Sequence, residues 1–200
     1  MIKIGIYGLA GADTAQNLLN RHRQELGKRF SRLFIRDLEE LGKYRTDVPE
    51  VSSPEVYIAA IGEGGLWAAL WKACDDWKEL HAEDRNVPSG CRINIADIPV
   101  KQEIIEICEL FEENPYEAPS ECARVILWDE DNVPDAYRHI IDRCTVIGLM
   151  TQEKGRILEY EDSVRYLTPP ARQAADMADR KSYAKKGKEA EVKTCLDRNY

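Results

Sequence analysis

Apolar positions along the chain follow two spacings, one typical of strands and one typical of helices. Residues Ile2–Tyr7 read as a strand, and an apolar stripe at helical spacing runs from Leu66 to Leu80. The same patterns predict further strands at residues 55–61, 91–95, 124–128, 145–150, 156–160 and 163–167. They also predict helices that start near residues 14, 31, 101 and 134.

Short polar side chains precede the first two of these helices. Asp13 or Thr14 is placed to cap the first helix, and Ser31 the second, because a side-chain oxygen can accept from the free N–H groups of a first turn. Gly42 is placed to end the second helix. Both predicted helices lie between the first two predicted strands, residues 2–7 and 55–61.

The order of strands and helices contains no repeat and no convincing internal linker. Two hundred residues suffice for one domain with a proper core, so we predict a single layered domain of strands and helices over residues 1–170. After Pro169 and Pro170 the sequence becomes polar and rich in alanine and lysine. We expect residues 171–200 to form a tail or a peripheral helix.

Composition narrows the classes of function. The chain is 44% hydrophobic and 32% charged, as in ordinary soluble globular proteins. Its net charge of -8 and pI of about 5.1 argue against general binding to nucleic acid or to anionic membranes. No apolar run approaches the roughly 18–20 residues that span a bilayer, and the start lacks the pattern of a signal peptide. We expect a cytoplasmic protein.

The cysteines and histidines suggest neither a metal site nor a catalytic base. A zinc site usually contains a close Cys-x-x-Cys pair, and the six cysteines contain none. We predict that five are reduced core or near-core residues, and that Cys195 lies in the exposed tail. His22, His81 and His139 fall on polar stretches without an acid-base partner nearby in the sequence.

The opening MIKIGIYGLAGADTAQNLL places glycines where dinucleotide-binding domains hold a pyrophosphate. That fingerprint needs G-x-G-x-x-G and an acidic residue roughly 20 positions later, at the end of a second strand. Here the glycines are Gly5, Gly8 and Gly11, and residues 31–41 are helical in pattern. We therefore predict no nicotinamide or flavin cofactor at this turn.

Later stretches resemble the AIR synthase-related proteins. Residues 98–127, IPVKQEIIEICELFEENPYEAPSECARVIL, are similar to that family's I-P-V-R-Q-E-T-x-E-I-C-E-F-F-x-x-N-P-Y segment. Residues 62–76, GEGGLWAALWKACDD, resemble its T-E-G-G helix start. Residues 139–170 resemble its closing G-R-I…R-Y-L-x-P-P segment. The resemblance runs in order from about Lys3 to Pro170.

The resemblance implies a fold and a missing partner domain. Members such as aminoimidazole ribonucleotide synthetase, the hydrogenase maturation factor and selenophosphate synthetase have two domains, and the N-terminal one carries ATP and acidic metal ligands. This chain resembles the C-terminal domain alone, which implies an α+β fold: a mixed sheet layered with helices, of partial ferredoxin-like topology. ATP and Mg²⁺ would then reach it only through a separate domain, so we expect no cofactor and no metal in the isolated chain.

The positions that line the family's cleft are partly lost. The family's histidine and aspartate are Ala59 and Ala60 here, so the resemblance assigns no catalytic residue. The cleft residues that survive form a remnant ligand-binding site: Glu63, Gly64, Gly65, Asn114 and Ser120. Each has an alternative structural role, since the glycines can turn the chain, Glu63 can favour a helix N-terminus, Asn114 can form a turn and Ser120 can be a loop hydroxyl.

Trp67 and Trp71 widen the apolar stripe of their helix to one side. They suit either a wider core contact or a docking surface, and we predict an interface there that joins copies of the chain or a partner protein.

Three functions remain open, and the loss of the cleft residues together with the ATP domain favours the first. The first is a non-catalytic or regulatory stand-alone domain that binds a protein or a small ligand. The second is one half of a split ATP-dependent enzyme. The third is a free-standing module that binds a small ligand in the remnant cleft.

Overall fold

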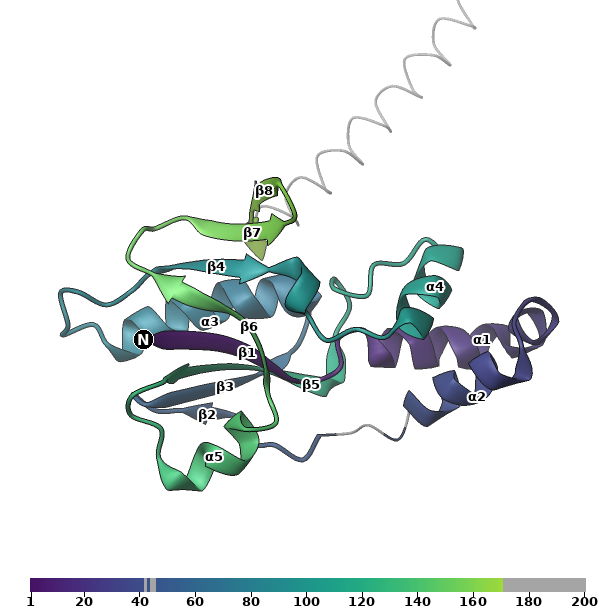
Figure 1. Ribbon diagram of the computed structural model, residues 1–200, viewed down its shortest axis with the longest axis horizontal. Helices are drawn as coiled ribbons and strands as arrows, with labels where there is room; N and C mark the ends of the chain where they lie inside the picture. The colour runs from purple at the N-terminus through teal and green to yellow at the C-terminus, as the bar shows by residue number, and fades with distance from the viewer. Residues whose placement is uncertain (42, 44–45, 171–200) are drawn as a thin grey trace, which may run out of the picture. The chain divides into compact units, whose positions relative to one another are not determined.

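The computed structural model describes residues 1–41, 43 and 46–170, and it contains an eight-stranded mixed sheet with helices. In chain order the elements are β1 (Ile2–Gly8), α1 (Ala12–Arg29), α2 (Arg32–Leu41), β2 (Val51–Ser52), β3 (Val56–Ile61), α3 (Gly65–Leu80), β4 (Gly90–Asn94), a 3-10 turn (Ile95–Asp97), α4 (Gln102–Leu110), β5 (Ser120–Asp129), α5 (Asp135–Ile141), β6 (Thr145–Thr151), β7 (Arg156–Tyr160) and β8 (Ser163–Tyr166). The predicted α+β class is confirmed (Figure 1).

The chain divides into a compact unit, Met1–Leu167, and a second unit, Thr168–Tyr200. The predicted tail over 171–200, with Cys195, lies outside the described residues, as does Gly42. None of the helices in the described part is long and apolar enough to cross a membrane.

The strands lie in the order β2-β3-β5-β1-β6-β4-β7-β8. Strand β4 pairs with β7 in parallel, and the other neighbours are antiparallel. The sequence patterns missed β2, a strand of two residues, and placed the start of β5 four residues late. At both positions the residues form a strand because they pair with a neighbouring strand, and no alternating apolar pattern marks them in the sequence.

Alternation along the central strands divides the core into two layers. Val125 and Leu127 of β5 belong to the core cluster that contains the inner stripe of α3, including Leu70 and Trp77. Ile126 and Trp128 of the same strand belong to a second cluster with Ile140 of α5. Neighbouring residues of a strand point to opposite faces, so α3 and α5 cover opposite faces of the sheet.

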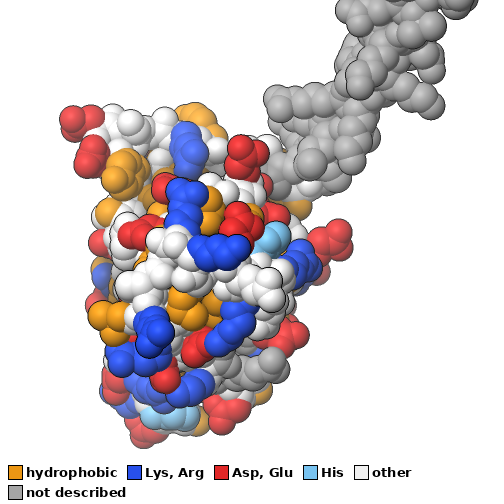
Figure 2. All heavy atoms as spheres, turned by 90° about the vertical axis from the view of Figure 1, so that its right-hand side faces the viewer, with side chains coloured by type: hydrophobic (Ala, Val, Ile, Leu, Met, Phe, Trp, Pro, Cys, Tyr) orange, Lys and Arg blue, Asp and Glu red, His pale blue; other side chains and the backbone are white. Residues whose placement is uncertain are grey.

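Helices α1, α2 and α4 form a third apolar cluster at one end of the sheet (Figure 1). Ser31 caps α2 as predicted, since its Oγ accepts from the backbone N–H of Phe34 at 3.2 Å. Figure 2 looks onto this end, where Lys and Arg side chains lie beside hydrophobic ones. Ion pairs such as Arg23–Glu39 and Arg36–Asp37 join side chains there.

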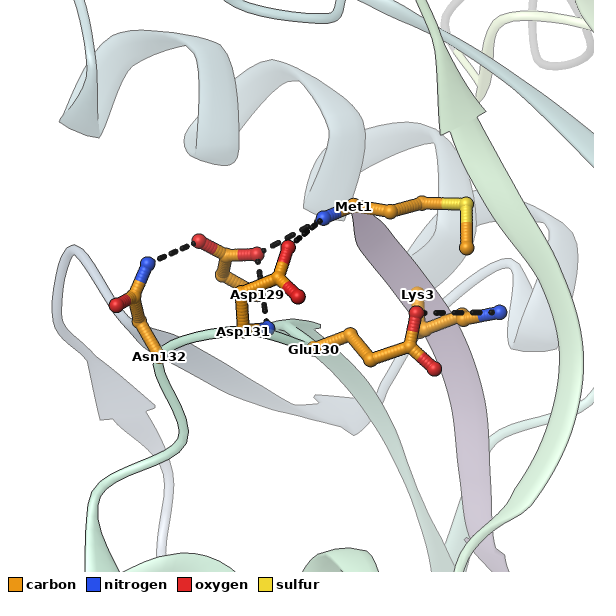
Figure 3. A network of polar contacts seen from close by, with 6 residues as sticks. All are labelled: Met1, Lys3, Asp129, Glu130, Asp131 and Asn132. Atoms are coloured by element: carbon orange, nitrogen blue, oxygen red, sulfur yellow. Dashed lines mark hydrogen bonds and ion pairs between the residues drawn. The ribbon is translucent and has the colours of Figure 1, made fainter.

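The opposite end of β1 carries a polar network (Figure 3). The amino group of Met1 contacts Asp129 Oδ1 and Asp131 Oδ2, each at 3.0 Å, and Asn132 Nδ2 donates to Asp129 Oδ2 at 2.7 Å. The hydrogen bond from Asn132 is the main reason that the pKa of Asp129 lies below its usual range. These groups are mostly exposed, so we assign them a small effect on stability.

Candidate functional site

The two glycine-rich turns of the sequence lie at the same edge of the sheet. Strands β1 and β3 are both antiparallel to β5, which lies between them, so their carboxyl ends meet the start of β5. Helices α1 and α3 begin directly after these two strands. We call this region, residues 8–13, 62–66 and 114–122, the glycine edge. In α/β proteins such an edge is a common place for ligands.

The glycines of the first turn pack against protein backbone and side chains. Gly8 and Gly11 have φ values of 92° and 73°, which favour glycine. A Cβ on Gly8 would lie 2.1 Å from the carbonyl oxygen of Cys122, and one on Gly11 would lie 2.5 Å from Cβ of Pro115. In this turn the space that a pyrophosphate would need beside the glycines is filled by the chain itself.

Asp13 joins the start of α1 to the start of β5. Its Oδ2 accepts from the backbone N–H groups of Glu121 and Cys122, the latter at 3.1 Å, and its Oδ1 accepts from the Cys122 thiol at 3.0 Å. The expectation that Asp13 or Thr14 caps α1 was wrong, because the cap position is Gly11, in left-handed conformation, and no side chain caps the helix. The carboxylate binds a strand instead of its own helix.

The second turn closes in a similar way. Gly64 and Gly65 have φ values of 81° and 68°, and a Cβ on Gly65 would lie 2.4 Å from the carbonyl oxygen of Tyr116. That carbonyl accepts from the backbone N–H of Leu66 at 2.8 Å, so it satisfies a donor in the first turn of α3. Gly62, by contrast, has open space around it, and Glu63 is exposed.

Asn114 and Ser120 complete the predicted remnant cleft. Asn114 forms a turn: its Oδ1 accepts from Tyr116 N at 3.0 Å, and its Nδ2 donates to Glu117 Oε1 at 2.8 Å. Ser120 is 2% exposed, and its Oγ and the Oγ1 of Thr14 are buried without a hydrogen-bond partner among the described residues. Ser120 therefore lies beneath the surface, where a ligand from solvent does not reach it.

The structure thus brings the five predicted cleft residues to one edge, but it engages most of them internally. Gly65 packs on the 116–117 backbone, Asn114 holds a turn and Ser120 is buried. Glu63 is the exposed member. The assignment of these residues to a ligand remains a prediction.

Two thiols near the core, those of Cys108 and Cys144, are poor nucleophiles. Burial raises the pKa of Cys108 to about 11 and that of Cys144 to about 12, so both are protonated at neutral pH. Burial also raises the pKa of Tyr116. The five cysteines of the described part are free thiols, and no group of three or more His, Cys, Asp or Glu side chains there could hold a metal ion.

The two tryptophans do not form an exposed pair. Trp67 is a core residue, 7% exposed, whose ring packs on Tyr116 at 5.1 Å between centroids. Trp71 is half-buried, and the Arg156 guanidinium lies over its ring at 4.0 Å. This corrects the expectation of a docking surface at Trp67, because the 114–122 segment covers the start of α3. Whether the chain forms oligomers remains a prediction.

Sequence reasoning missed two residues that organise this region. Asp13 was assigned to its own helix, although a carboxylate so close to a glycine turn can also reach a neighbouring strand. Arg156 is 8% exposed, donates to the Trp71 carbonyl at 2.8 Å and pairs with Asp75. An arginine at the start of a strand gave no signal that it would be buried.

No protein-family model matches the chain, and no curated protein matches it. Solved structures do. The crystal structure of E. coli HypE has a TM-score of 0.55 and 19% identity, over 84% of this chain and 50% of that one. The hydrogenase maturation protein HypE in complex with ATP has a TM-score of 0.55 and 15% identity, with the same coverage. The structure of the HypE–HypF complex has a TM-score of 0.51 and 16% identity, over 84% of this chain and 53% of that one.

At these identities the likeness shows the fold alone. The fold is of the AIR synthase-related type expected from the sequence, and the chain spans about half the length of the HypE structures that it matches.

Proposed function

We propose that this chain is a non-catalytic or regulatory domain of the AIR synthase-related type that acts by binding another protein. The glycine edge carries the proposal. There, the Asp13 carboxylate accepts hydrogen bonds from backbone N–H groups of β5, and the Tyr116 carbonyl accepts one from the backbone N–H of Leu66 at the start of α3. A site that binds phosphates would leave such donors free for the ligand.

The exposed apolar side chains of the last hairpin supply a docking surface for this partner. Tyr160, Val164 and Tyr166 are 49%, 63% and 72% exposed, and all lie on β7 or β8. Strand β8 ends the sheet, and its four side chains are exposed. Large exposed apolar groups gathered on one element mark interaction sites. HypE, whose fold this chain shares, has been crystallised in complex with another protein, HypF.

A second candidate is the C-terminal half of a split ATP-dependent enzyme. The observation that favours it is length, because the chain covers 50% of a HypE structure solved with ATP. In this case the partner protein would be the ATP-binding half, and activity would require both chains.

A photocrosslinking amino acid placed at position Tyr160 identifies the partner in the native cell. The partner is then purified and mixed with the chain. We expect a defined complex that is weakened at least about tenfold by Val164→Ser with Tyr166→Ser. Leu33→Ser is the matched control, because Leu33 is 56% exposed on α2. It should leave the complex intact.

ATP hydrolysis separates the two candidates. We expect no activity from the chain alone or from the reconstituted complex. ATP hydrolysis by the complex, but not by the chain without its partner, would identify a split enzyme. Activity of the chain alone that is lost on Glu63→Ala, or a complex that is unaffected by the hairpin variant, would contradict the proposal.

A further inference from the structure

A cavity of about 620 Å³ lies at the carboxyl end of α3, between the loop of residues 81–89 and the turn of residues 152–155. Figure 1 shows these two segments on the side of the molecule away from α1 and α2. Helix α3 has 16 residues, so the cavity is roughly 24 Å along the helix from the glycine edge. It is a separate site.

Hydrogen bonds fix the two walls of this cavity to each other. Ser89 N donates to the Thr151 carbonyl at 3.1 Å, and Gln152 Nε2 donates to the Asn86 carbonyl at 2.7 Å. Gly90 lies so close to the turn that a Cβ there would be 1.9 Å from the Glu153 carbonyl oxygen. The cavity is therefore a built feature whose walls are held in place without a ligand.

Three cations line the cavity: Lys78 from α3, Arg85 from the loop and Lys154 from the turn. They come from three separate segments, and none has an ion-pair partner among the residues that the structure describes. Cations that converge on a cavity without carboxylate partners favour an anionic ligand, and phosphate most of all.

Two of the three acidic residues that line the cavity already have partners within the protein. Asp75 pairs with Arg156, and Asp84 Oδ1 accepts from Asn86 N at 2.8 Å. Glu79 also lines the cavity, and its carboxylate has no ion pair or hydrogen bond within the part of the chain that the structure describes. Carboxylates beside cations are suited to accept hydrogen bonds from ligand hydroxyls, because an ionised carboxylate has several acceptor sites.

The lining is polar apart from Ala82 and Val87. It offers Ser89 and Gln152 as further hydrogen-bonding groups and no aromatic ring. This composition suits a ligand rich in hydroxyl groups better than one with a flat apolar ring system.

We propose that this cavity binds a small phosphorylated polyol, with the phosphate held by Lys78, Arg85 and Lys154 and the hydroxyls by Glu79, Ser89 and Gln152. Each ligand group then meets the side-chain chemistry that complements it. The site is independent of the proposed protein docking, which uses the β7–β8 hairpin.

Titration calorimetry with glucose 6-phosphate, glycerol 3-phosphate, inorganic phosphate and glucose tests this proposal. We expect at least one of the two polyol phosphates to bind saturably, at least about tenfold more tightly than inorganic phosphate, and glucose alone not to bind. The triple variant Lys78→Gln, Arg85→Gln, Lys154→Gln should weaken binding at least about tenfold. Amide shifts of Ser89 and Thr151 in NMR spectra should follow the titration in the wild type.

The matched control is Lys28→Gln, Arg29→Gln, Arg32→Gln, which removes three exposed cations at the opposite end of the molecule. It should bind like the wild type, with circular dichroism showing that both variants are folded. The proposal is overturned if neither polyol phosphate binds with a dissociation constant below about 10 mM. Equal weakening in both triple variants, or equal binding of inorganic phosphate, would also overturn it, because either would indicate general anion attraction.

Discussion

At its amino end α3 meets the backbone of Tyr116 and Glu117 so closely that only glycine fits, whereas at its carboxyl end it borders a cavity of about 620 Å³. The first end resembles a ligand site in sequence, with Glu63, Gly64 and Gly65 at the start of a helix. The second end has no motif, but its cations lack ion-pair partners in the described part of the chain.

This difference shows what a glycine-rich turn does and does not indicate. Glycine allows close approach by backbone and a positive φ, and both hold for Gly65. The approaching group is the chain's own 116–117 segment. A pattern of glycines therefore locates a close contact without saying whether the contact is a ligand or another part of the protein.

The largest expected effect separates the two tryptophans along α3. Trp67→Ala should lower the free energy of unfolding by about 3–5 kcal/mol, because it leaves a cavity in the core. Trp71→Ala should cost about 1–2 kcal/mol, since it removes a half-buried ring that lies under Arg156. Urea denaturation measures both. Equal costs would show that the start of α3 is no better covered than its middle.

The next effect tests the close contact itself. Gly65→Ala should destabilise the fold by about 2–4 kcal/mol, because it strains a φ of 68° and forces Cβ against the Tyr116 carbonyl. Gly62→Ala, three residues away in open space, is the control and should stay within about 0.5 kcal/mol of the wild type. If Gly65→Ala leaves the stability unchanged, the 114–122 segment moves away easily, as it would have to do for a ligand to enter at this edge.

Most of the fold could be predicted from the sequence, because hydrophobic periodicity reports which face of each element is buried. The stripe of α3 and the strands β1, β6 and β7 followed directly. Tertiary contacts decided the rest. The partner of Asp13 lies 108 residues away, on β5, and the ring of Trp67 is covered by Tyr116 from a loop. Periodicity along one helix cannot reveal such distant partners.

The candidate site was predictable only as a location. The resemblance placed five residues that the fold does gather at one edge, yet it could not show that Ser120 would be buried or Asn114 held in a turn. The cavity at the other end of α3 gave no sequence signal, since Lys154 lies far along the chain from Lys78 and Arg85, and all three read as ordinary exposed charges.

A smaller effect tests how the glycine edge is held together. Asp13→Ala should lower stability by about 2–3 kcal/mol, because two backbone N–H groups at the start of β5 lose their acceptor. Asp13→Asn should cost less, since its amide oxygen can still accept one of these bonds. Glu63→Ala, at the exposed corner of the same edge, should change stability by no more than about 0.5 kcal/mol. A comparable loss for Glu63→Ala in urea denaturation would indicate that Glu63, too, has an internal role.

The smallest expected effect on stability belongs to the cavity at the carboxyl end of α3. The triple variant Lys78→Gln, Arg85→Gln, Lys154→Gln should stay within about 0.5 kcal/mol of the wild type, because these exposed side chains have no ion-pair partners among the described residues. Repulsion between the three positive charges would make the triple variant slightly more stable than the wild type. That gain in stability should shrink in about 1 M salt, where the Debye length is about 3 Å. Urea denaturation at low and high salt measures this. A clear loss of stability would show that the cations already stabilise the fold and are not reserved for a ligand.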